Sequence, residues 1–339
     1  MFDIITFGSA SWDIFLKPKR VQTVKSNKFI ANKGVCFNLG SKIDIEELNV
    51  YSGGGGTNTA ATFANQGFKT AFSGMIGDDI GGREMTEELK NRNIDTSLVV
   101  KTKLRPTNHS FIVIIPNEDR TILVYRGASE LLCKGNIDWT KLKAEWFYLA
   151  PLSGSLCNIS RDLVDFAYKN KIKVAFNPGN SQLIMPSKTL KNIFKHVNIL
   201  ILNQEEASLL TKIPYTKEKE IFKKIDELCP GVFIMTKGSK GAVVSDGSFI
   251  YRADSLKTEV IDRTGAGDSF ASGFVSGYIR SKSDIKYAIQ LGTANSAYCL
   301  TKYGAKNALL KKSDKFKKVK VIKELCSKNN SCQIKNYES

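Results

Sequence analysis

The segment NILILNQEEASLLTKIPYTKEKEIFKKIDELCPGVFIMT, residues 198–236, places two short apolar runs at the ends of a longer, more polar stretch. The runs at residues 198–202 and 232–236 are rich in Ile, Leu and Val, which predicts buried strands. Residues 204–211 and 217–228 carry helical patterns, and a connection of this length links parallel strands. The segment therefore predicts an α/β fold with a largely parallel central sheet.

The same alternation recurs along the chain, so we predict a doubly wound, mostly parallel sheet with helices on both faces. Further strands are expected at residues 4–7, 70–76, 146–149 and 172–176. Further helices are expected at residues 57–66, 82–92 and 160–170.

Two regions depart from this alternation, residues 15–51 and 98–125. Alternating apolar patterns at residues 111–115 and 121–124 predict antiparallel strands there. Ligands of open α/β sheets bind at the carboxyl ends of the strands, where a small β element can cover the site. We therefore expect these regions to form a β element outside the main sheet and next to a site.

The composition is that of an ordinary globular protein, with 42% apolar and 24% charged residues. The sequence has no run of about 18 apolar residues, and its start lacks the features of a signal peptide. The seven cysteines never occur in a C-x-x-C spacing and the chain has two histidines, so neither a disulfide framework nor a zinc site is predicted. We expect a cytoplasmic protein that makes no membrane contact.

The net charge of +17 raises the question of nucleic-acid binding, because clustered Lys and Arg bind phosphate backbones. Lysine is spread along the whole chain, however, and is dense only in residues 311–323. A solvated helix face or a flexible end explains that segment more simply than a nucleic-acid contact does. A basic protein also suits an anionic substrate or nucleotide.

The stretch VIDRTGAGDSF, residues 260–270, carries the strongest indication of chemistry. The small residues Gly265, Ala266 and Gly267 allow backbone N–H groups to gather at the start of a helix, where they bind an anion such as phosphate. Asp268 would lie on the first turn, where its carboxylate can accept a proton from a hydroxyl group beside that phosphate. The alternative is that Asp268 is a favourable first-turn acid and that the glycines form a tight turn.

A second glycine-rich stretch, GGGGTNTA at residues 53–60, also leads into a predicted helix. Its glycines let the backbone approach a ligand closely, and Asn58 offers both a hydrogen-bond donor and an acceptor. Four consecutive glycines lose much conformational entropy on folding, which favours a binding loop over a merely flexible one. The stretch is not a Walker A loop, since no G-K-[ST] follows, and the chain has no dinucleotide-binding fingerprint in the usual position.

Together these stretches resemble the two signatures of the ribokinase-like, or PfkB, family of carbohydrate kinases. The first signature matches Asn58-x-Ala60 with Gly67 and Gly77 at the family spacing, and the second matches D-x-T-G-A-G-D at residues 262–268. The likeness extends over residues 2–306 through further motifs, which are Phe7-Gly8-Ser9 to Asp13, Gly77-Asp78-Asp79, Asn203-x-x-Glu206 and Thr236-Lys237-Gly238-x-x-Gly241.

The resemblance implies a ribokinase-like, doubly wound kinase domain over residues 1–310. We expect the small β lid to comprise residues 14–52 and 98–126, and the lysine-rich end of the chain to form a basic C-terminal tail at residues 311–339. The implied activity is ATP-dependent, with Mg²⁺, and phosphorylates a hydroxyl group, expected to be primary, of a sugar or sugar derivative. The catalytic residues would be Asp268 as the base and Gly265, Ala266 and Gly267 as the anion hole.

The other site residues carry over from the family by position. The sugar hydroxyls would be held by Asp13, Gly54, Gly55 and Asn58. The nucleotide and its phosphates would be bordered by Asn203, Glu206, Thr236, Gly238, Gly241 and Asn295. Of these, Glu206 would place Mg²⁺ through water and Asn295 would face the adenine. Asp13 could instead cap a turn, and Asn203 with Glu206 could be an N-cap and a first-turn acid.

Some family members use a monovalent cation, and here Asp262 and Thr264 would lie next to it, so K⁺ is a further candidate cofactor. The chain departs from the family pattern at Arg263, where a small or β-branched residue is usual, and this adds a positive charge beside the anion hole. The residues Asn177-Pro178-Gly179-Asn180 replace an acid and a later arginine, which weighs against a phosphorylated-sugar substrate.

Three other interpretations stay open. A nucleoside kinase, of the adenosine type, would use the same chemistry, and aromatic side chains near the lid could stack on its base: Phe15, Phe29, Phe37 and Phe111. A non-catalytic family member could bind sugar or nucleic acid with its basic tail. The β element could pair with a second copy in a homodimer, or the chain could be a monomer.

Overall fold

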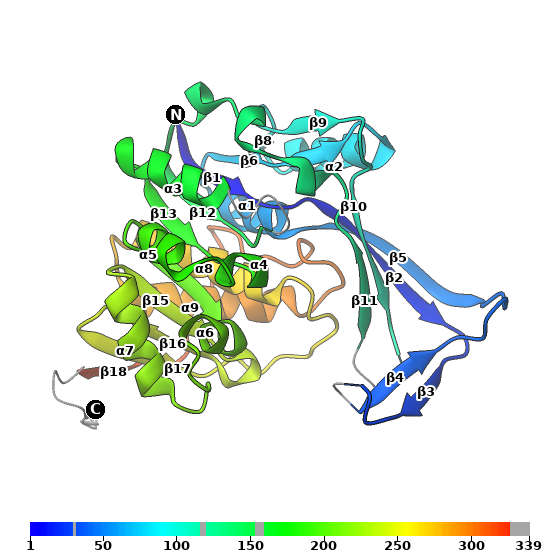
Figure 1. Cartoon of the computed structure of the whole chain (residues 1–339). Coiled ribbons are helices and arrows are strands. Elements are labelled where there is room, and N and C mark those ends of the chain that lie inside the picture. Colours follow the sequence, from blue (N-terminus) through cyan, green and yellow to red (C-terminus); the bar gives the residue numbers. More distant parts are fainter. Residues whose placement is uncertain (30–31, 116–119, 153–158, 326–339) are drawn as a thin grey trace.

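The computed structural model describes residues 1–29, 32–115, 120–152 and 159–325 (Figure 1). These residues form a ten-stranded central sheet in the order β18-β17-β16-β15-β14-β13-β12-β1-β6-β8. Every neighbouring pair from β15 to β8 is parallel, and the pairs from β15 to β18 are antiparallel. The strands are β1 (Phe2–Phe7), β6 (Thr70–Ser73), β8 (Ile94–Asp95), β12 (Ala144–Leu149), β13 (Lys173–Phe176), β14 (Ile199–Asn203), β15 (Val232–Thr236), β16 (Ala242–Ser245), β17 (Phe249–Ala253) and β18 (Ile322–Leu325).

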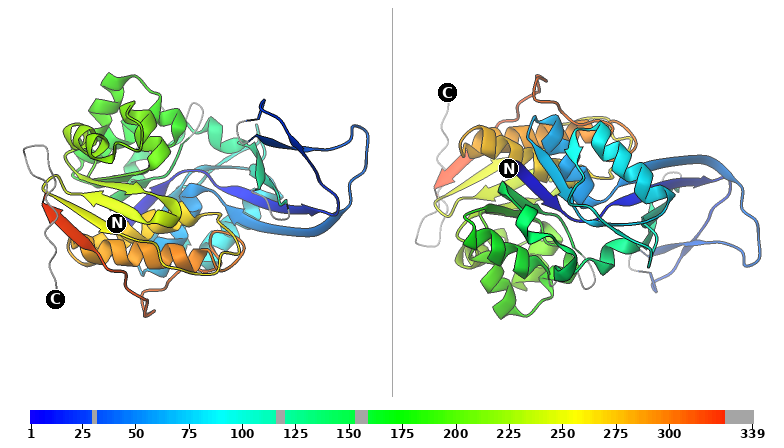
Figure 2. Two further views of the ribbon diagram at one scale, coloured as in Figure 1. Left: turned by 90° about the horizontal axis from the view of Figure 1, so that it is seen from below. Right: turned by 90° about the horizontal axis from the view of Figure 1, so that it is seen from above.

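Helices cover both faces of this sheet, which confirms the doubly wound α/β fold (Figure 2). The α-helices are α1 (Gly55–Asn65), α2 (Ile80–Asn91), α3 (Ile159–Lys169), α4 (Asn180–Leu183), α5 (Ser187–Phe194), α6 (Gln204–Thr211), α7 (Glu218–Leu228), α8 (Ala266–Arg280) and α9 (Ile285–Cys299). The short 3-10 helices are η1 (Ala128–Leu131), η2 (Lys134–Asn136), η3 (Trp139–Lys141) and η5 (Gly238–Lys240). In β1, Ile5 belongs to the buried cluster that also contains side chains of α3, α5, α6 and α7, whereas Ile4 belongs to the cluster on the other face with side chains of α1, α8 and α9. Because both strand faces are buried, the strands are continuous apolar runs.

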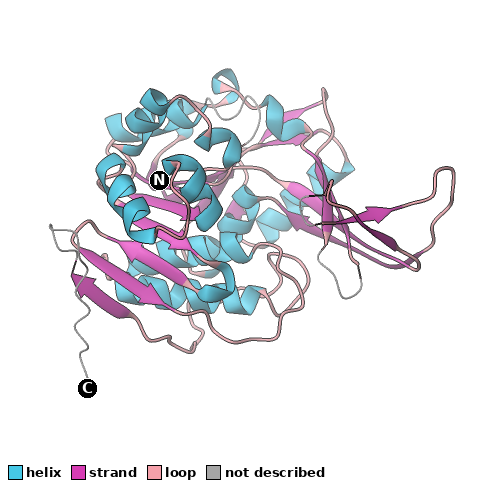
Figure 3. Ribbon diagram, turned by 60° about the horizontal axis from the view of Figure 1, so that its bottom comes forward, coloured by secondary structure: helices cyan, strands magenta, loops and turns pink. Residues whose placement is uncertain are grey.

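The β element is a four-stranded sheet in the order β11-β10-β2-β5 that extends to one side of the domain (Figure 3). Its strands are β2 (Ser11–Pro18), β5 (Ile45–Gly53), β10 (Asn108–Val113) and β11 (Thr121–Tyr125), and a hairpin of β3 (Gln22–Lys25) and β4 (Lys33–Cys36) accompanies it. The pair β10–β11 is antiparallel, as predicted, and β2–β5 is antiparallel as well. The sequence made no prediction for the pairing of β2 with β10, and these two strands are parallel because both run outward from the domain.

The strand predicted at residues 70–76 is divided at Gly74 into β6 and β7 (Met75–Gly77). A Cβ atom on Gly74 would lie 2.4 Å from the Phe72 ring and 2.7 Å from the Gly8 carbonyl oxygen. The backbone therefore passes too close to its neighbours for any other residue. After this point the chain leaves the central sheet, and β7 pairs with β9 (Val100–Thr102) instead.

The basic C-terminal segment does not form the predicted helix face as far as residue 325: residues 311–321 are irregular and mostly exposed, and residues 322–325 form β18. β18 pairs antiparallel with β17 and becomes the edge strand of the central sheet. The Lys323 ammonium lies 3.7 Å from the centroid of the Phe249 ring, and Arg252 pairs with Glu324 at 3.4 Å. The charged residues of β18 therefore protect the edge of the central sheet, with the Lys323 side chain packed on the Phe249 ring. Residues 326–339 of the predicted tail lie outside the described residues.

None of the helices in the described part of the chain combines the length and the apolar character that crossing a bilayer requires.

Candidate active site

The two glycine-rich stretches of the sequence lie side by side in the structure. α1 begins after Gly54, with φ of 96°, and α8 begins after Gly265, with φ of 75°, and both values favour glycine. The two helices pack together, and Nδ2 of Asn58 donates a hydrogen bond of 2.8 Å to Oδ2 of Asp268. Segments far apart in the sequence therefore converge on one carboxylate.

The start of α8 has the geometry of an anion hole. A Cβ atom on Gly265 would lie 2.3 Å from Cβ of Ala305, whereas one on Gly267 would meet nothing within 4 Å. The first helical hydrogen bond runs from the Ser269 amide to the Gly265 carbonyl oxygen. In the described part of the chain, the amides of Gly267 and Asp268 have no acceptor. These free donors and the helix dipole favour a bound anion.

Asp268 lies in the first turn of α8 and is partly buried. Burial raises the pKa of its carboxyl group, the hydrogen bond from Asn58 opposes this shift, and the charge of Asp13 adds to it. A carboxylate with a raised pKa is a stronger proton acceptor than an exposed aspartate. Asp268 can therefore act as a base on the same helical turn as the free amides.

Asp13 lies on β2 next to the glycine-rich loop and is buried. Oδ1 of Asp13 accepts a hydrogen bond of 3.1 Å from the Ser11 hydroxyl, and a Cβ atom on Gly53 would lie 2.0 Å from Oδ2. Burial raises the pKa of Asp13. Oδ1 of Asn58 is also buried and has no partner among the described residues. Carboxylate and amide oxygens thus gather where a polyhydroxylated ligand could donate hydrogen bonds.

Asn203 and Glu206 form a capping box at the start of α6. Oδ1 of Asn203 accepts from the Glu206 amide at 2.8 Å, and Oε2 of Glu206 accepts from the Asn203 amide at 2.8 Å. Asn203 is therefore an N-cap and Glu206 a first-turn acid, as the alternative interpretation of this pair predicted. The capping box uses only one of the two carboxylate oxygens of Glu206. Burial raises the pKa of Glu206, and the nearby charges of Glu205 and Asp268 add to the shift. Their role towards a nucleotide stays a prediction.

The other predicted nucleotide residues lie at the end of β15, beside Asn203, and in the segment that follows it. Thr236 is the register partner of Asn203. Gly238 has φ of 56° and open space around its Cβ position. A Cβ atom on Gly241 would lie 2.0 Å from the Ala253 carbonyl oxygen, so backbone packing against β17 already explains this glycine. Thr236 and Gly238 remain predicted nucleotide contacts.

The predicted contact between Asn295 and adenine is wrong. Asn295 is 0% exposed, and Nδ2 donates to the Ser269 carbonyl oxygen at 2.8 Å while Oδ1 accepts from the Leu310 amide at 2.9 Å. Its amide group is therefore committed within the protein, where it joins α9 to α8 and to the C-terminal segment. Position in the family motif does not reveal this, because an amide that binds a ligand and one that binds backbone look alike in sequence.

We predict that Asn295→Ala destabilises the fold without weakening nucleotide binding. The buried Leu310 amide loses its partner and the Ser269 carbonyl oxygen, which lies within α8, loses its side-chain donor, which corresponds to a loss of about 1–3 kcal/mol in the free energy of unfolding. Urea unfolding measures this loss, and the KM for ATP, taken at a temperature where the variant is folded, is expected to stay within about twofold. An unchanged unfolding midpoint together with a raised KM for ATP would restore the adenine assignment.

The loop predicted to lie beside a monovalent cation is closed by Asp262. Oδ1 accepts from the amide and hydroxyl of Thr264 at 2.9 and 2.8 Å, and Oδ2 accepts from the Gly304 amide at 3.0 Å. Asp262 therefore joins its own loop to the loop at Gly304 by hydrogen bonds. The binding of K⁺ stays a prediction. Among the described residues, no group of three or more His, Cys, Asp and Glu side chains could hold a metal ion.

The aromatic side chains expected near a base have different environments. Phe15 is buried between Tyr51 and Tyr303, at ring-centroid distances of 5.9 and 5.8 Å, so it cannot stack on a ligand. Phe29, Phe37 and Phe111 are exposed in the region of the lid.

Three residues near the site were not singled out from the sequence. Ser110 is the register partner of Asp13 on β10, and hydrogen bonding to it opposes the rise in the pKa of Asp13. Tyr148 is fully buried, and its hydroxyl has no partner among the described residues. Lys306 is buried near Asp13. Strand pairing could have indicated Ser110, but no sequence pattern identifies the other two.

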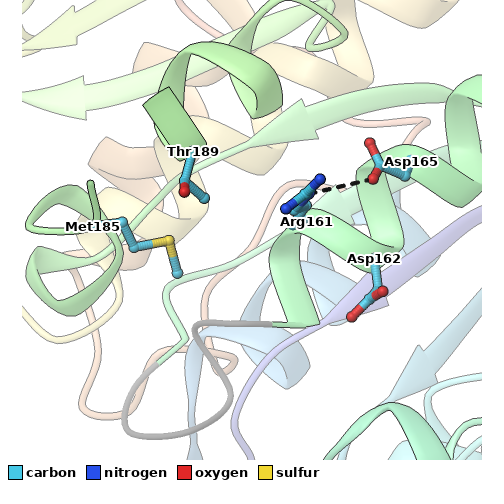
Figure 4. A pocket seen from close by; sticks show the side chains of 5 residues that line it. All are labelled: Arg161, Asp162, Asp165, Met185 and Thr189. Atoms are coloured by element: carbon cyan, nitrogen blue, oxygen red, sulfur yellow. Dashed lines mark ion pairs between the residues drawn. The ribbon is translucent and has the colours of Figure 1, made fainter. Parts of the chain in front are cut away.

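A separate pocket of about 400 Å³ lies against α3 (Figure 4). Arg161 and Asp165 in its wall pair with each other at 3.6 Å, and Asp162 pairs with Lys134 at 2.8 Å. Since none of its lining residues is a predicted site residue and its charges are already paired, we assign it no role in the candidate active site.

Comparison with known proteins gives a consistent result. The family model described as pfkB family carbohydrate kinase matches residues 25–312. The ribokinase of Staphylococcus aureus is 28% identical over 278 residues, which are 80% of this chain and 89% of that protein. The solved structure of Arabidopsis thaliana ribokinase complexed with ribose and ATP has a TM-score of 0.75 at 21% identity, over 91% of this chain and 96% of that one. The Methanocaldococcus jannaschii nucleoside kinase has a TM-score of 0.72 at 22% identity, over 91% and 95%. Both structures share the fold of this chain.

Proposed function

The chain belongs to the pfkB family of carbohydrate kinases, phosphotransferases with an alcohol group as acceptor, and we propose that it transfers the γ-phosphoryl group of ATP to a primary hydroxyl group of a sugar or sugar derivative. The observation that carries this proposal is the hydrogen bond of 2.8 Å between Asn58 and Asp268. It joins the loop that would hold the sugar to the helix start that would hold the phosphate. The two reactants of a kinase would therefore meet at this carboxylate.

In the proposed reaction, Asp13, Asn58 and the backbone of Gly54 and Gly55 bind the sugar hydroxyls. Oδ1 of Asp268 faces this loop, since a Cβ atom on Gly55 would lie 3.6 Å from it. Asp268 accepts the proton of the attacking hydroxyl as the new P–O bond forms. Phosphoryl transfer otherwise depends on alignment and charge stabilisation, which a binding loop and an anion hole provide.

The amides at Gly265, Ala266 and Gly267 would stabilise the negative charge that develops on the transferred phosphoryl group, although the Ala266 amide also donates a weak hydrogen bond of 3.4 Å to the Arg263 carbonyl oxygen and the Gly267 amide has no acceptor among the described residues. Mg²⁺ bound to ATP would neutralise the phosphates, and the residues present fit such an ion, because one oxygen of Glu206 is free of the capping box. Glu206 would hold it through water, with Asn203 beside it. No step of the reaction depends on K⁺ at Asp262 and Thr264.

A nucleoside is the second candidate substrate. The chain shares its fold with a nucleoside kinase, and three exposed aromatic side chains lie in the lid region, where they could stack on a base: Phe29, Phe37 and Phe111. The carboxylate and amide oxygens around Asp13 suit the hydroxyls of a ribose and of a free sugar equally. The two candidates therefore differ in what the lid contacts, not in the chemistry.

The test is ADP release by the purified full-length protein with Mg-ATP and a panel of sugars, sugar acids and nucleosides. Substrate-dependent ADP release from one class would support the kinase and identify that class. Background ADP release that no panel member increases, together with no binding of ATP by calorimetry, would contradict the proposal. Since the protein has free thiols among its described residues, reducing conditions suit the assay and the proposed cytoplasmic location.

We also propose that two copies pair through their lids. β11 is exposed along its whole length, and Leu123 is 58% exposed on it. An exposed apolar edge strand favours pairing with another chain. Sedimentation at micromolar concentration is expected to show a dimer that Leu123→Lys dissociates. Leu209→Lys, which changes a 43% exposed leucine on α6, is the matched control and is expected to stay dimeric. A monomeric wild type would contradict the proposal.

A further inference from the structure

A cavity of about 260 Å³ lies behind the lid, between β2, β5, α2 and the segment after α9. We name it the Lys306 cavity; its lining residues are Trp12, Val50, Tyr51, Ser52, Glu88, Arg92, Lys306 and Asn307. Trp12 and Ser52 are register partners, and they alternate along their strands with Asp13 and Tyr51. Since side chains alternate between the faces of a sheet, the Trp12 side of the lid is opposite to the Asp13 side. Trp12, Val50 and Ser52 line the cavity from the side of the lid opposite to Asp13, and Tyr51 is the one lining residue in register with Asp13, so the lining comes mainly from the face away from the candidate active site.

Lys306 is the unusual group in this cavity, because its ammonium is buried without a counterion. The residue is 3% exposed, and Nζ donates to Oγ1 of Thr57 at 3.0 Å. Its other contact is the weak acceptor Sδ of Met85 at 4.0 Å. In the described part of the chain, no carboxylate forms an ion pair with it. A buried charge without a partner costs several kcal/mol in real proteins.

The remaining charges of the cavity are balanced among themselves. Nε of Arg92 donates to Oε1 of Glu88 at 2.9 Å, and Nη1 donates to the Lys306 carbonyl oxygen at 3.2 Å. Burial acts to raise the pKa of Glu88, but the charge of Lys306 and hydrogen bonds from Ser52 and Arg92 lower it overall, so Glu88 is ionised. One carboxylate thus faces two cations, and the cavity keeps one unmatched positive charge.

We propose that the Lys306 cavity binds a small organic anion whose phosphate or carboxylate group lies on the Lys306 ammonium and the Arg92 guanidinium. The cavity is many times larger than the about 10–15 Å³ that a single water needs, and smaller than the about 300–1,000 Å³ of drug-sized pockets. Trp12, Val50 and Tyr51 offer apolar surface to a carbon skeleton. Burial lowers the pKa of Lys306 to about 8, against the charges of Glu88 and Asp13, as expected for an ammonium that lacks an anion.

Hydrogen bonds connect the Lys306 cavity to the glycine-rich loop at residues 53–56, which would hold the sugar. Lys306 donates to Thr57, and Oγ1 of Thr57 donates to the Gly53 carbonyl oxygen at 2.7 Å. Gly53 in turn lies directly against Asp13. If the proposed function holds, the bound anion changes the affinity for the sugar, and the sugar changes the affinity for the anion by the same factor. The anion would therefore act as an effector.

The experiment titrates the nucleotide-free full-length protein with inorganic phosphate, and in a second arm with acetate, while following tryptophan fluorescence. Trp12 lines the cavity and reports on it, and Trp12→Phe identifies its part of the signal. A saturable Trp12 signal is expected in wild type and in Lys302→Met, which changes an exposed lysine of the same segment. Lys306→Met is expected to lose this signal, or to need at least about tenfold more anion. The anion with the lower half-saturating concentration shows whether the cavity prefers a phosphate or a carboxylate group.

Asn307→Asp provides a second variant at an exposed position in the cavity wall, should Lys306→Met fail to fold. Its added negative charge is expected to raise the half-saturating anion concentration at least about threefold. A Trp12 signal that neither anion changes in wild type, or that Lys306→Met or Asn307→Asp leaves unchanged, would overturn the proposal. The measurement uses neither ATP nor sugar, so a chain without kinase activity could still bind the anion.

Discussion

Asp268→Asn is expected to lower kcat by at least about a hundredfold, the usual contribution of a general base. Asparagine keeps the size of the side chain, and its Oδ1 can still accept the hydrogen bond that Asn58 donates to Asp268. The variant therefore removes the proton acceptor while it preserves the local contact. The KM values for ATP and for the sugar are expected to change by less than about threefold, because binding uses other groups.

The pH profile separates loss of the base from loss of structure. Because burial raises the pKa of Asp268, kcat of the wild type is expected to fall as the pH drops through that raised pKa, where the carboxylate becomes protonated. Asp268→Asn has no such group and is expected to lose this acid limb. Circular dichroism and the thermal midpoint serve as folding controls. A folded variant with kcat within tenfold of wild type would exclude Asp268 as the base.

The sheet and its helices could be predicted from the sequence because local patterns determine them. Strands that are buried on both faces are apolar throughout, as in β14 and β15, and the helix between residues 204 and 211 was predicted with its observed bounds. The meeting of Asn58 with Asp268 was implied by the family motifs and not by the pattern itself. The sequence alone shows two helix starts, and only the packing of α1 on α8 brings them together.

The features that the sequence did not predict correctly, or did not predict at all, have a common physical cause, which is that tertiary contacts decide them. The parallel pairing of β2 with β10 depends on the direction in which each strand leaves the domain. The basic segment around Lys323 forms a strand because the edge of β17 accepts it. Asn295 and Lys306 are polar residues whose roles follow from what surrounds them. No periodicity or spacing of residues reports on such surroundings.

Glu206→Gln is expected to lower kcat/KM for Mg-ATP by about 10–100-fold, the usual effect of removing a group that holds the ligands of a metal ion in place, here the water molecules around Mg²⁺. The substitution separates two roles that coexist in this side chain. Glutamine fills the same position in a capping box, so it can still accept from the Asn203 amide. It carries no charge, however, and so cannot attract a hydrated cation. The Mg²⁺ concentration for half-maximal activity is therefore expected to rise.

Glu205→Gln is the matched control, because Glu205 is exposed in the same helical turn. It loses the same charge near the helix start, where the dipole favours acids by about 0.3–1 kcal/mol, so both variants share any loss in stability that follows from the dipole. Only Glu206 is partly buried and repelled by the charge of Asp268, and a divalent cation near both carboxylates would relieve that repulsion. If the two variants show the same kcat/KM and the same Mg²⁺ dependence, Glu206 serves only to cap α6, and the metal must be placed by other groups.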